Sequence, residues 1–245
     1  MRVNRFFVDE PLRAGTEVRL PEAAAMHLVR VLRGAVGDHC VLFNGDGSDY
    51  AARILAVGKR DARVEIIGAQ DPANESTLRI TLLQSLARGE KMDLVLQKAT
   101  ELGVAGFVPV ASERSEVRLD GERVDKRVAH WRNVVIAACE QSGRARVPSV
   151  AIPVALPQAL QTLEPASTRL LLDPVATLVA GDLDLDASRH VVLAIGPEGG
   201  WSPRDRSALV GAGFQGLRMG PRILRTETAG IAAIAALQAL HGDFR

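Results

Sequence analysis

Short apolar runs separated by polar turns dominate the first 70 residues. Runs of this length that are rich in branched residues predict β-strands. The sequence Asn44–Gly47 (NGDG) predicts a tight turn, because Gly and Asn tolerate positive φ. One helix interrupts the strands; it begins at Pro21 and ends by Gly34. Several short strands with one helix favour a small β-barrel. The predicted strands are Val3–Val8, Val18–Leu20, Cys40–Phe43, Tyr50–Val57 and Val64–Ile67.

A polar, turn-rich stretch, Gly68–Glu75 (GAQDPANE), follows these strands. Beyond it the apolar pattern changes from short runs to an alternation of strand and helix periods. We therefore predict a domain boundary in this stretch, with one domain over residues 1–72 and a second over residues 73–245.

The second domain alternates strands with amphipathic helices, which predicts a mostly parallel sheet covered by helices on both faces. The fold class is therefore α/β. Gly106–Val110 is predicted to end at Pro109, which cannot donate a backbone hydrogen bond. The predicted strands are Leu78–Leu86, Gly106–Val110, Val150–Ile152, Arg169–Leu172, His190–Ile195 and Phe214–Met219. The predicted helices are Lys91–Leu102, Glu122–Gln141, Pro157–Leu163, Ser202–Gly213 and Thr226–His241.

Composition narrows the class of protein. Apolar residues make up 47% of the chain and charged residues 24%, as in ordinary soluble proteins, and the net charge is only +1. A nucleic-acid surface must therefore be a local basic patch. Cys40 and Cys139 lie far apart without a Cys/His cluster, so we expect buried thiols and no metal site. The sequence shows neither a signal segment nor a membrane span, which predicts a cytoplasmic protein.

Three loops follow predicted strands of the second domain, at the positions where open α/β sheets bind ligands. They are Leu172–Pro174, Gly196–Gly200 (GPEGG) and Gly220–Arg222. Glycines in the second loop allow a ligand to approach the backbone closely. A plain strand-to-helix turn, with Glu198 favouring the helix start, explains the composition of that loop equally well. The loop matches neither GxGxxG nor a P-loop, which argues against a dinucleotide-binding fold.

A series of motifs gives the chain a specific resemblance to a known family. They occur in order along nearly the whole chain: NRFFV at 4–8, FNG at 43–45, KATELG at 98–103, SERS at 112–115, EQSGR at 140–144, IGPEGG at 195–200 and RILRTETA at 222–229. In this order they resemble the RsmE family, bacterial enzymes that methylate N3 of a uridine in 16S ribosomal RNA with S-adenosylmethionine.

The resemblance implies a SPOUT-type methyltransferase domain with a C-terminal trefoil knot, preceded by a PUA-like β-barrel that binds RNA. Periodicity alone does not predict the knot, because connectivity rules make knots rare. The resemblance also implies a homodimer that acts on 16S rRNA or the small ribosomal subunit. It places the S-adenosylmethionine among the three loops, at Leu172, Gly196, Glu198, Gly200, Leu217, Met219, Gly220, Ile223 and Leu224.

The chemistry of the reaction suggests roles for charged residues. The N3 atom is a poor nucleophile until its proton leaves, so a base or a cation that stabilises the uracil anion would help. Glu198 is the predicted base and Arg225 the predicted catalytic cation. Arg222 is expected to contact RNA, and a salt bridge to Glu227 is an alternative for either arginine. The other predicted RNA contacts are Arg5, Arg30, Arg33, Arg88, Lys91, Arg114, Arg144 and Arg146.

Residues Ala229–Leu240 are apolar nearly all round, with Gln238 as the polar exception. Such a helix must be buried and is too short to span a membrane. We expect it in a dimer interface, although burial within one subunit is the alternative.

Two other functions fit the sequence. One is methylation of a tRNA ribose by an enzyme of the same fold. The other is a non-catalytic RNA-binding protein of ribosome assembly, which would not bind S-adenosylmethionine.

Overall fold

The computed structural model describes residues 3–116, 121–164, 167–185 and 189–244. Contacts divide the chain into two compact units. The first contains Met1–Glu75 together with Ile136–Val147, and the second contains Ser76–Val135 and Pro148–Arg245. The predicted division at residues 72 and 73 lies close to the first of these boundaries. The sequence pattern gave no sign that the segment 136–147, which includes the end of a long helix, packs with the first unit.

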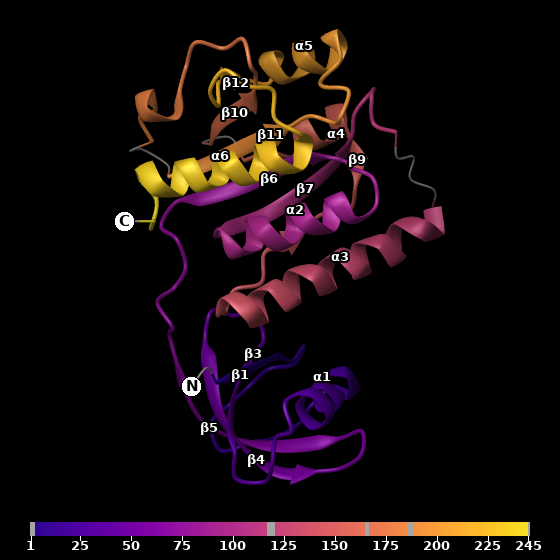
Figure 1. Cartoon of the computed structure of the whole chain (residues 1–245), viewed down its shortest axis with the longest axis vertical. Helices are drawn as coiled ribbons and strands as arrows, with labels where there is room; N and C mark the ends of the chain where they lie inside the picture. The colour runs from indigo at the N-terminus through magenta and orange to yellow at the C-terminus, as the bar shows by residue number, and fades with distance from the viewer. Residues whose placement is uncertain (1–2, 117–120, 165–166, 186–188, 245) are drawn as a thin grey trace. The chain divides into compact units, whose positions relative to one another are not determined.

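The first unit is built on a five-stranded sheet in the order β1-β3-β4-β5-β2 (Figure 1). Strand β1 runs parallel to β3, and the other pairs are antiparallel. One helix accompanies the sheet and continues into a π-helical turn, η1. Its apolar core contains Phe6, Leu28, Leu42, Ile54 and Val64. The elements are β1 (Asn4–Phe7), β2 (Glu17–Arg19), α1 (Glu22–Met26), η1 (His27–Val31), β3 (His39–Phe43), β4 (Asp49–Val57) and β5 (Ala62–Gln70).

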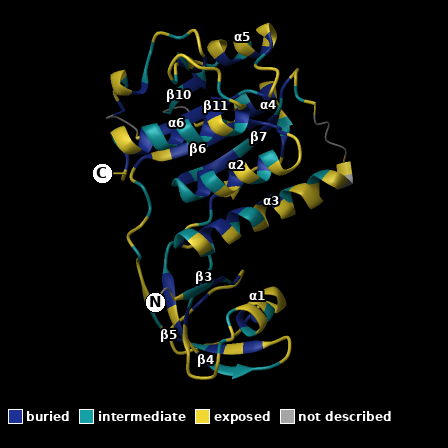
Figure 2. Cartoon of the chain, in the orientation of Figure 1, coloured by how far each residue is buried: buried dark blue, intermediate teal, exposed yellow. Residues whose placement is uncertain are grey.

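The second unit contains a parallel sheet in the order β12-β10-β11-β6-β7-β8, with β9 also paired to β7. Its central strand β11 is buried along its whole length, as expected for a sheet covered on both faces (Figure 2). The strands are β6 (Arg79–Ser85), β7 (Val104–Ala111), β8 (Ser149–Val150), β9 (Val154–Ala155), β10 (Thr168–Leu172), β11 (His190–Ile195) and β12 (Gln215–Leu217).

Helices cover both faces of this sheet. On one face α2 and α6 pack against each other, and the Gly230 backbone of α6 lies against Leu82. The next residue of β6, Leu83, points to the opposite face and packs with Leu156 of α4 and Leu209 of α5. The helices are α2 (Glu90–Glu101), α3 (Gly121–Ser142), α4 (Leu156–Gln161), α5 (Pro203–Gly211), α6 (Thr226–His241) and the 3-10 turn η2 (Ala180–Asp182). The mixed α/β fold with a parallel sheet is therefore as predicted.

The prediction that a strand ends at Pro109 was wrong, because β7 continues to Ala111. Pro109 faces Gln84 of β6 in the parallel register. On its other side, β7 pairs with β8 at Gly106–Phe107 and with β9 at Val110–Ala111. Pro109 lies between these two paired stretches, a position where a missing donor is tolerated.

Candidate functional site

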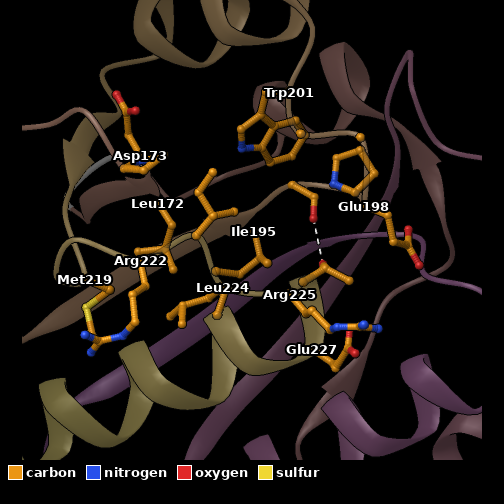
Figure 3. A pocket seen from close by; sticks show the side chains of 18 of the residues that line it. Leu172, Asp173, Ile195, Glu198, Trp201, Met219, Arg222, Leu224, Arg225 and Glu227 are labelled. Atoms are coloured by element: carbon orange, nitrogen blue, oxygen red, sulfur yellow. Dashed lines mark hydrogen bonds between the residues drawn. The ribbon is translucent and has the colours of Figure 1, made fainter.

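Three loops follow the carboxyl ends of β10, β11 and β12 and surround a cavity of about 630 Å³. The strands are neighbours in the order β12-β10-β11, so their ends open on one edge of the sheet. Apolar side chains from each strand end and from the segment before α6 line it (Figure 3). Every residue predicted to bind the cofactor lies on its wall: Leu172, Gly196, Glu198, Gly200, Leu217, Met219, Gly220, Ile223 and Leu224.

Two glycines of the Gly196–Gly200 loop are required for different reasons. A Cβ at Gly196 would lie 3.3 Å from Nε1 of Trp201, so the indole packs directly on this backbone. A Cβ at Gly200 would meet no atom of the described residues within 4 Å, but the φ of Gly200, +67°, is one that other residues rarely adopt. Gly200 is therefore required by the turn and not by a close contact within the chain.

A buried hydrogen-bond chain fixes the start of this loop. The Thr226 hydroxyl donates to the Gly196 carbonyl at 2.7 Å, and Nε2 of Gln84 donates to Oγ1 of Thr226 at 3.2 Å. Gln84 is 0% exposed and Thr226 5%. Neither residue was singled out from the sequence, although Gln84 lies in the predicted strand Leu78–Leu86 and Thr226 lies within the RILRTETA motif.

The end of the loop is held by a residue of the turn that follows β7. Arg114 donates from Nη1 to the Gly199 carbonyl at 3.0 Å. The turn that carries Arg114 is braced by three serine hydroxyls, since Oγ of Ser85 lies 2.7 Å from Ser112 and 2.9 Å from Ser115. Arg114 was predicted to contact RNA; here its guanidinium contacts the loop backbone.

Glu198 forms an ion pair with Lys91, with 2.9 Å between Oε1 and Nζ. Burial raises the pKa of Glu198, but the hydrogen bond from Lys91 and backbone N–H groups outweigh burial and lower it overall. A carboxylate with a lowered pKa is a poorer proton acceptor. The geometry therefore favours an anchoring role for Glu198 over the predicted role of base.

Asp173 follows β10 and forms an ion pair with Arg206 of α5 at the cavity wall. The hydrogen bond from Arg206 lowers the pKa of Asp173 below its usual range. A Cβ at Gly216 would lie 3.2 Å from Oδ2 of Asp173 and 3.0 Å from Cβ of Ala176, so the glycine makes room for the pair. The Leu172–Pro174 loop was predicted from the sequence to lie at a ligand site, but no role was predicted for this carboxylate.

Arg222 and Arg225 both line the cavity and are exposed. They extend toward opposite sides of it, Arg222 on the side of Met219 and Arg225 on the side of Glu227 (Figure 3). Oε2 of Glu227 is buried and has no hydrogen-bond partner among the described residues. No ion pair joins Glu227 to either arginine within the described part of the chain, so the alternative of such a salt bridge is not supported.

Two arginines predicted to contact RNA are engaged inside the first unit. Arg5 is bidentate to Asp49, with Nη2 2.7 Å from Oδ1, and its side chain is 10% exposed. Arg144 pairs with Glu75 at 2.6 Å and its side chain is 7% exposed. A guanidinium buried in an ion pair is not available to a phosphate. We therefore expect neither Arg5 nor Arg144 to contact RNA.

The other predicted RNA contacts are more accessible. Arg30, Arg33 and Arg146 are exposed in the first unit, where the Arg146 guanidinium lies over Gly47. In the second unit the exposed Arg88 pairs with Glu116 at 2.6 Å. Charges paired at the surface can exchange partners at low cost, which leaves Arg88 available to a phosphate.

The described residues offer neither a metal-binding cluster nor a membrane-spanning helix. They contain no group of three or more His, Cys, Asp or Glu side chains arranged to hold a metal ion. Among the same residues, no helix has the length and apolar character needed to cross a membrane.

Comparison with known proteins gives consistent matches over the chain. A family profile described as an RNA methyltransferase domain matches residues 74–238, and one described as an RNA methyltransferase PUA domain matches residues 20–67. The ribosomal RNA small subunit methyltransferase E of Buchnera aphidicola is 34% identical over 99% of this chain and 98% of its own length.

Solved structures agree with these matches. The ribosomal RNA small subunit methyltransferase E of Neisseria gonorrhoeae, bound to S-adenosyl methionine, is 44% identical, with a TM-score of 0.94 and full coverage of both chains. A putative methyltransferase of Legionella pneumophila in complex with the bound cofactor SAM is 38% identical, with a TM-score of 0.94, over 99% of this chain and 100% of that one.

Proposed function

The chain belongs to the ribosomal RNA small subunit methyltransferase E family, and from this membership we infer that it methylates N3 of a uridine in 16S ribosomal RNA with S-adenosylmethionine. The observation that carries the proposal is the cavity at the ends of β10, β11 and β12, because every residue expected around the cofactor lines it.

The cavity suits S-adenosylmethionine. Its volume of about 630 Å³ lies in the range of small-molecule sites. Leu172, Ile195, Leu217 and Leu224 offer apolar surface to an adenine ring. Nε1 of Trp201 is a buried donor without a partner among the described residues, so the cavity wall offers at least one polar contact. When bound, the cofactor supplies a sulfonium methyl group as the electrophile.

The residues of the cavity must also make uridine N3 a better nucleophile. We assign to Arg225 the stabilisation of negative charge on a uracil carbonyl, because its planar guanidinium offers paired donors. Its side chain is exposed at the start of α6, where an incoming base can reach it. Glu198 and Lys91 hold the Gly196–Gly200 loop in shape through their ion pair.

RNA contacts are assigned to exposed cations. In the PUA-like domain, residues 1–72, these are Arg30 and Arg33. In residues 73–245 they are Arg88 and Arg222, together with Arg146, whose segment 136–147 packs with the first unit. Lys91 and Arg114 act mainly through the cofactor loop that they contact. The expected partner is 16S rRNA or the small ribosomal subunit, which places the protein in the cytoplasm.

A homodimer is proposed from α6. Its Ile231, Ala232, Ala235 and Ala236 are half-buried and Leu240 is 49% exposed, which leaves an apolar strip on the helix. Such a strip is typical of an interface between subunits. We also propose that the loops around the cavity form the trefoil knot of the family.

The decisive experiment incubates the pure protein and isotope-labelled S-adenosylmethionine with small ribosomal subunits and, separately, with naked 16S RNA. Nuclease digestion and mass spectrometry then identify the modified nucleoside. N3-methyluridine is the expected product. A 2′-O-methylated nucleoside would indicate ribose methylation, and no product together with no cofactor binding by calorimetry would indicate an assembly protein.

A further inference from the structure

A second cavity, of about 520 Å³, lies beside the start of α6. It shares Lys91 and Glu227 with the cofactor cavity, so the two cavities adjoin at these side chains. The residues that line it are Glu90, Lys91, Asp93, Leu94, Gln97, Val134 and Glu227.

The charges of this second cavity exclude a phosphate and suit a neutral ring. Three carboxylates, from Glu90, Asp93 and Glu227, line this cavity with one ammonium, that of Lys91, and Asp93 is also bonded to Nε2 of His130 at 2.8 Å. Such an excess of negative charge repels the RNA backbone. Leu94 and Val134 supply apolar surface for the faces of a flat base.

The polar side chains match the Watson–Crick edge of uracil, which presents a carbonyl, an N–H group and a second carbonyl. Recognition therefore needs a donor, an acceptor and a donor. Lys91 and Gln97 can donate, and Lys91 keeps free N–H groups beside its bond to Glu198 because an ammonium has three. Glu227 can accept, and its buried Oε2 lacks a partner among the described residues. Cytosine has no proton on N3 and would leave that acceptor unsatisfied.

We propose that the second cavity receives the target uracil and that Glu227 is the catalytic base that accepts the N3 proton. The inference rests on the proposed uridine methylation. In this step the N3–H bond breaks, its electron pair stays on N3, and the proton joins a carboxylate oxygen of Glu227. The proton passes to water after the reaction. Glu227 is two residues from Arg225, so both the base and the carbonyl-stabilising cation come from the start of α6.

Glu227→Gln tests the proposal with small ribosomal subunits as substrate. The single-turnover rate should fall at least about 100-fold, as is typical for the loss of a general base. Cofactor affinity by calorimetry and subunit affinity by filter binding should stay within about threefold of the wild type, because neither uses the proton transfer. The matched control is Glu101→Gln, which removes a carboxylate of α2 that lines neither cavity and pairs with Lys98. This variant should retain the wild-type rate.

The pH dependence separates a base from a structural residue. The rate defect of Glu227→Gln should shrink as the pH is raised from about 7 to about 9, because hydroxide then removes the N3 proton in place of the carboxylate. A defect that is constant over this range, or a folded variant with the wild-type rate, would overturn the assignment. A wild-type protein that forms no N3-methyluridine would instead refute the proposed function itself.

A binding measurement tests the cavity without turnover. In saturation-transfer NMR, the wild-type protein should give a stronger signal with uridine than with cytidine. Gln97→Leu should reduce this difference, because a donor to a uracil carbonyl is lost. Equal signals for the two nucleosides with the wild type would contradict the placement of uracil in this cavity.

Discussion

Replacing Thr226 by valine tests how the cofactor loop is held. Its hydroxyl donates to the Gly196 carbonyl at 2.7 Å and accepts from Nε2 of Gln84 at 3.2 Å, and the residue is 5% exposed. Valine has nearly the same shape but no hydroxyl. Thr226→Val therefore removes both hydrogen bonds while changing the packing little.

The two losses differ in cost. Nε2 of Gln84 keeps a second acceptor, the Ser85 carbonyl at 2.9 Å. The carbonyl of the half-buried Gly196 loses the hydroxyl that the structure gives it, and an acceptor left unsatisfied away from water costs about 1–3 kcal/mol. We expect a loss of about 2 kcal/mol in the free energy of unfolding. If the loop also shifts, cofactor affinity falls about tenfold for each ~1.4 kcal/mol needed to restore its shape.

Urea unfolding and calorimetric titration with S-adenosylmethionine measure the two effects separately. Thr226→Ser keeps the hydroxyl and should retain most of the affinity. Thr228→Val, at an exposed position two residues further along α6, is the matched control and should change neither quantity. If Thr226→Val leaves both stability and cofactor affinity at the wild-type values, the hydrogen-bond chain does not hold the loop.

Three further predictions concern other parts of the molecule. Arg225→Lys should lower the single-turnover rate about 100-fold with little change in calorimetric cofactor affinity, because one preorganised donor to a developing anion is lost; loss of cofactor binding would indicate a structural role. Burial raises the pKa of Glu140, so the stabilisation that this group contributes is lost as the pH rises through its folded pKa. Glu140→Gln can keep the 3.0 Å bond from Phe7 N–H and should gain stability over the wild type as pH rises, and a thermal-shift difference that is constant with pH would contradict this. Light scattering at micromolar protein should give about twice the chain mass of 26.2 kDa, and a monomeric mass would exclude the proposed dimer.

The local pattern of apolar and polar residues was enough to locate most helices and strands of the fold. The predicted helix Thr226–His241 has the bounds of α6, and the predicted strand His190–Ile195 has those of β11. Both have strong signals in sequence: a long apolar helix preceded by polar residues, and a buried strand followed by glycine. Pro109 shows the limit of this reasoning, since its place in β7 depends on the gap between β8 and β9, two strands that begin about 40 residues later.

The loops of the candidate site could be predicted from the sequence. The long-range contacts that hold these loops could not. Glycine-rich loops after strands identified the cavity, because the ends of parallel strands meet at one edge of a sheet. Gln84 and Thr226 were missed because their partners lie far along the chain: Gly196 is 30 residues from Thr226, and Thr226 is 142 residues from Gln84. The same is true of the pair between Asp173 and Arg206, which are 33 residues apart.

The arginines of the first unit show why charge in a sequence does not identify an RNA surface. Arg5 forms an ion pair with Asp49, which lies 44 residues away in the sequence, and Arg144 pairs with Glu75, 69 residues away. Removing one partner of a buried pair leaves an uncompensated charge, which costs about 3–5 kcal/mol. If an Arg5→Ala variant binds RNA weakly, the cause is therefore a destabilised fold and not the loss of a phosphate contact. The exposed Arg30 and Arg33 allow a cleaner test of the RNA surface, because their side chains can be removed without breaking a buried pair.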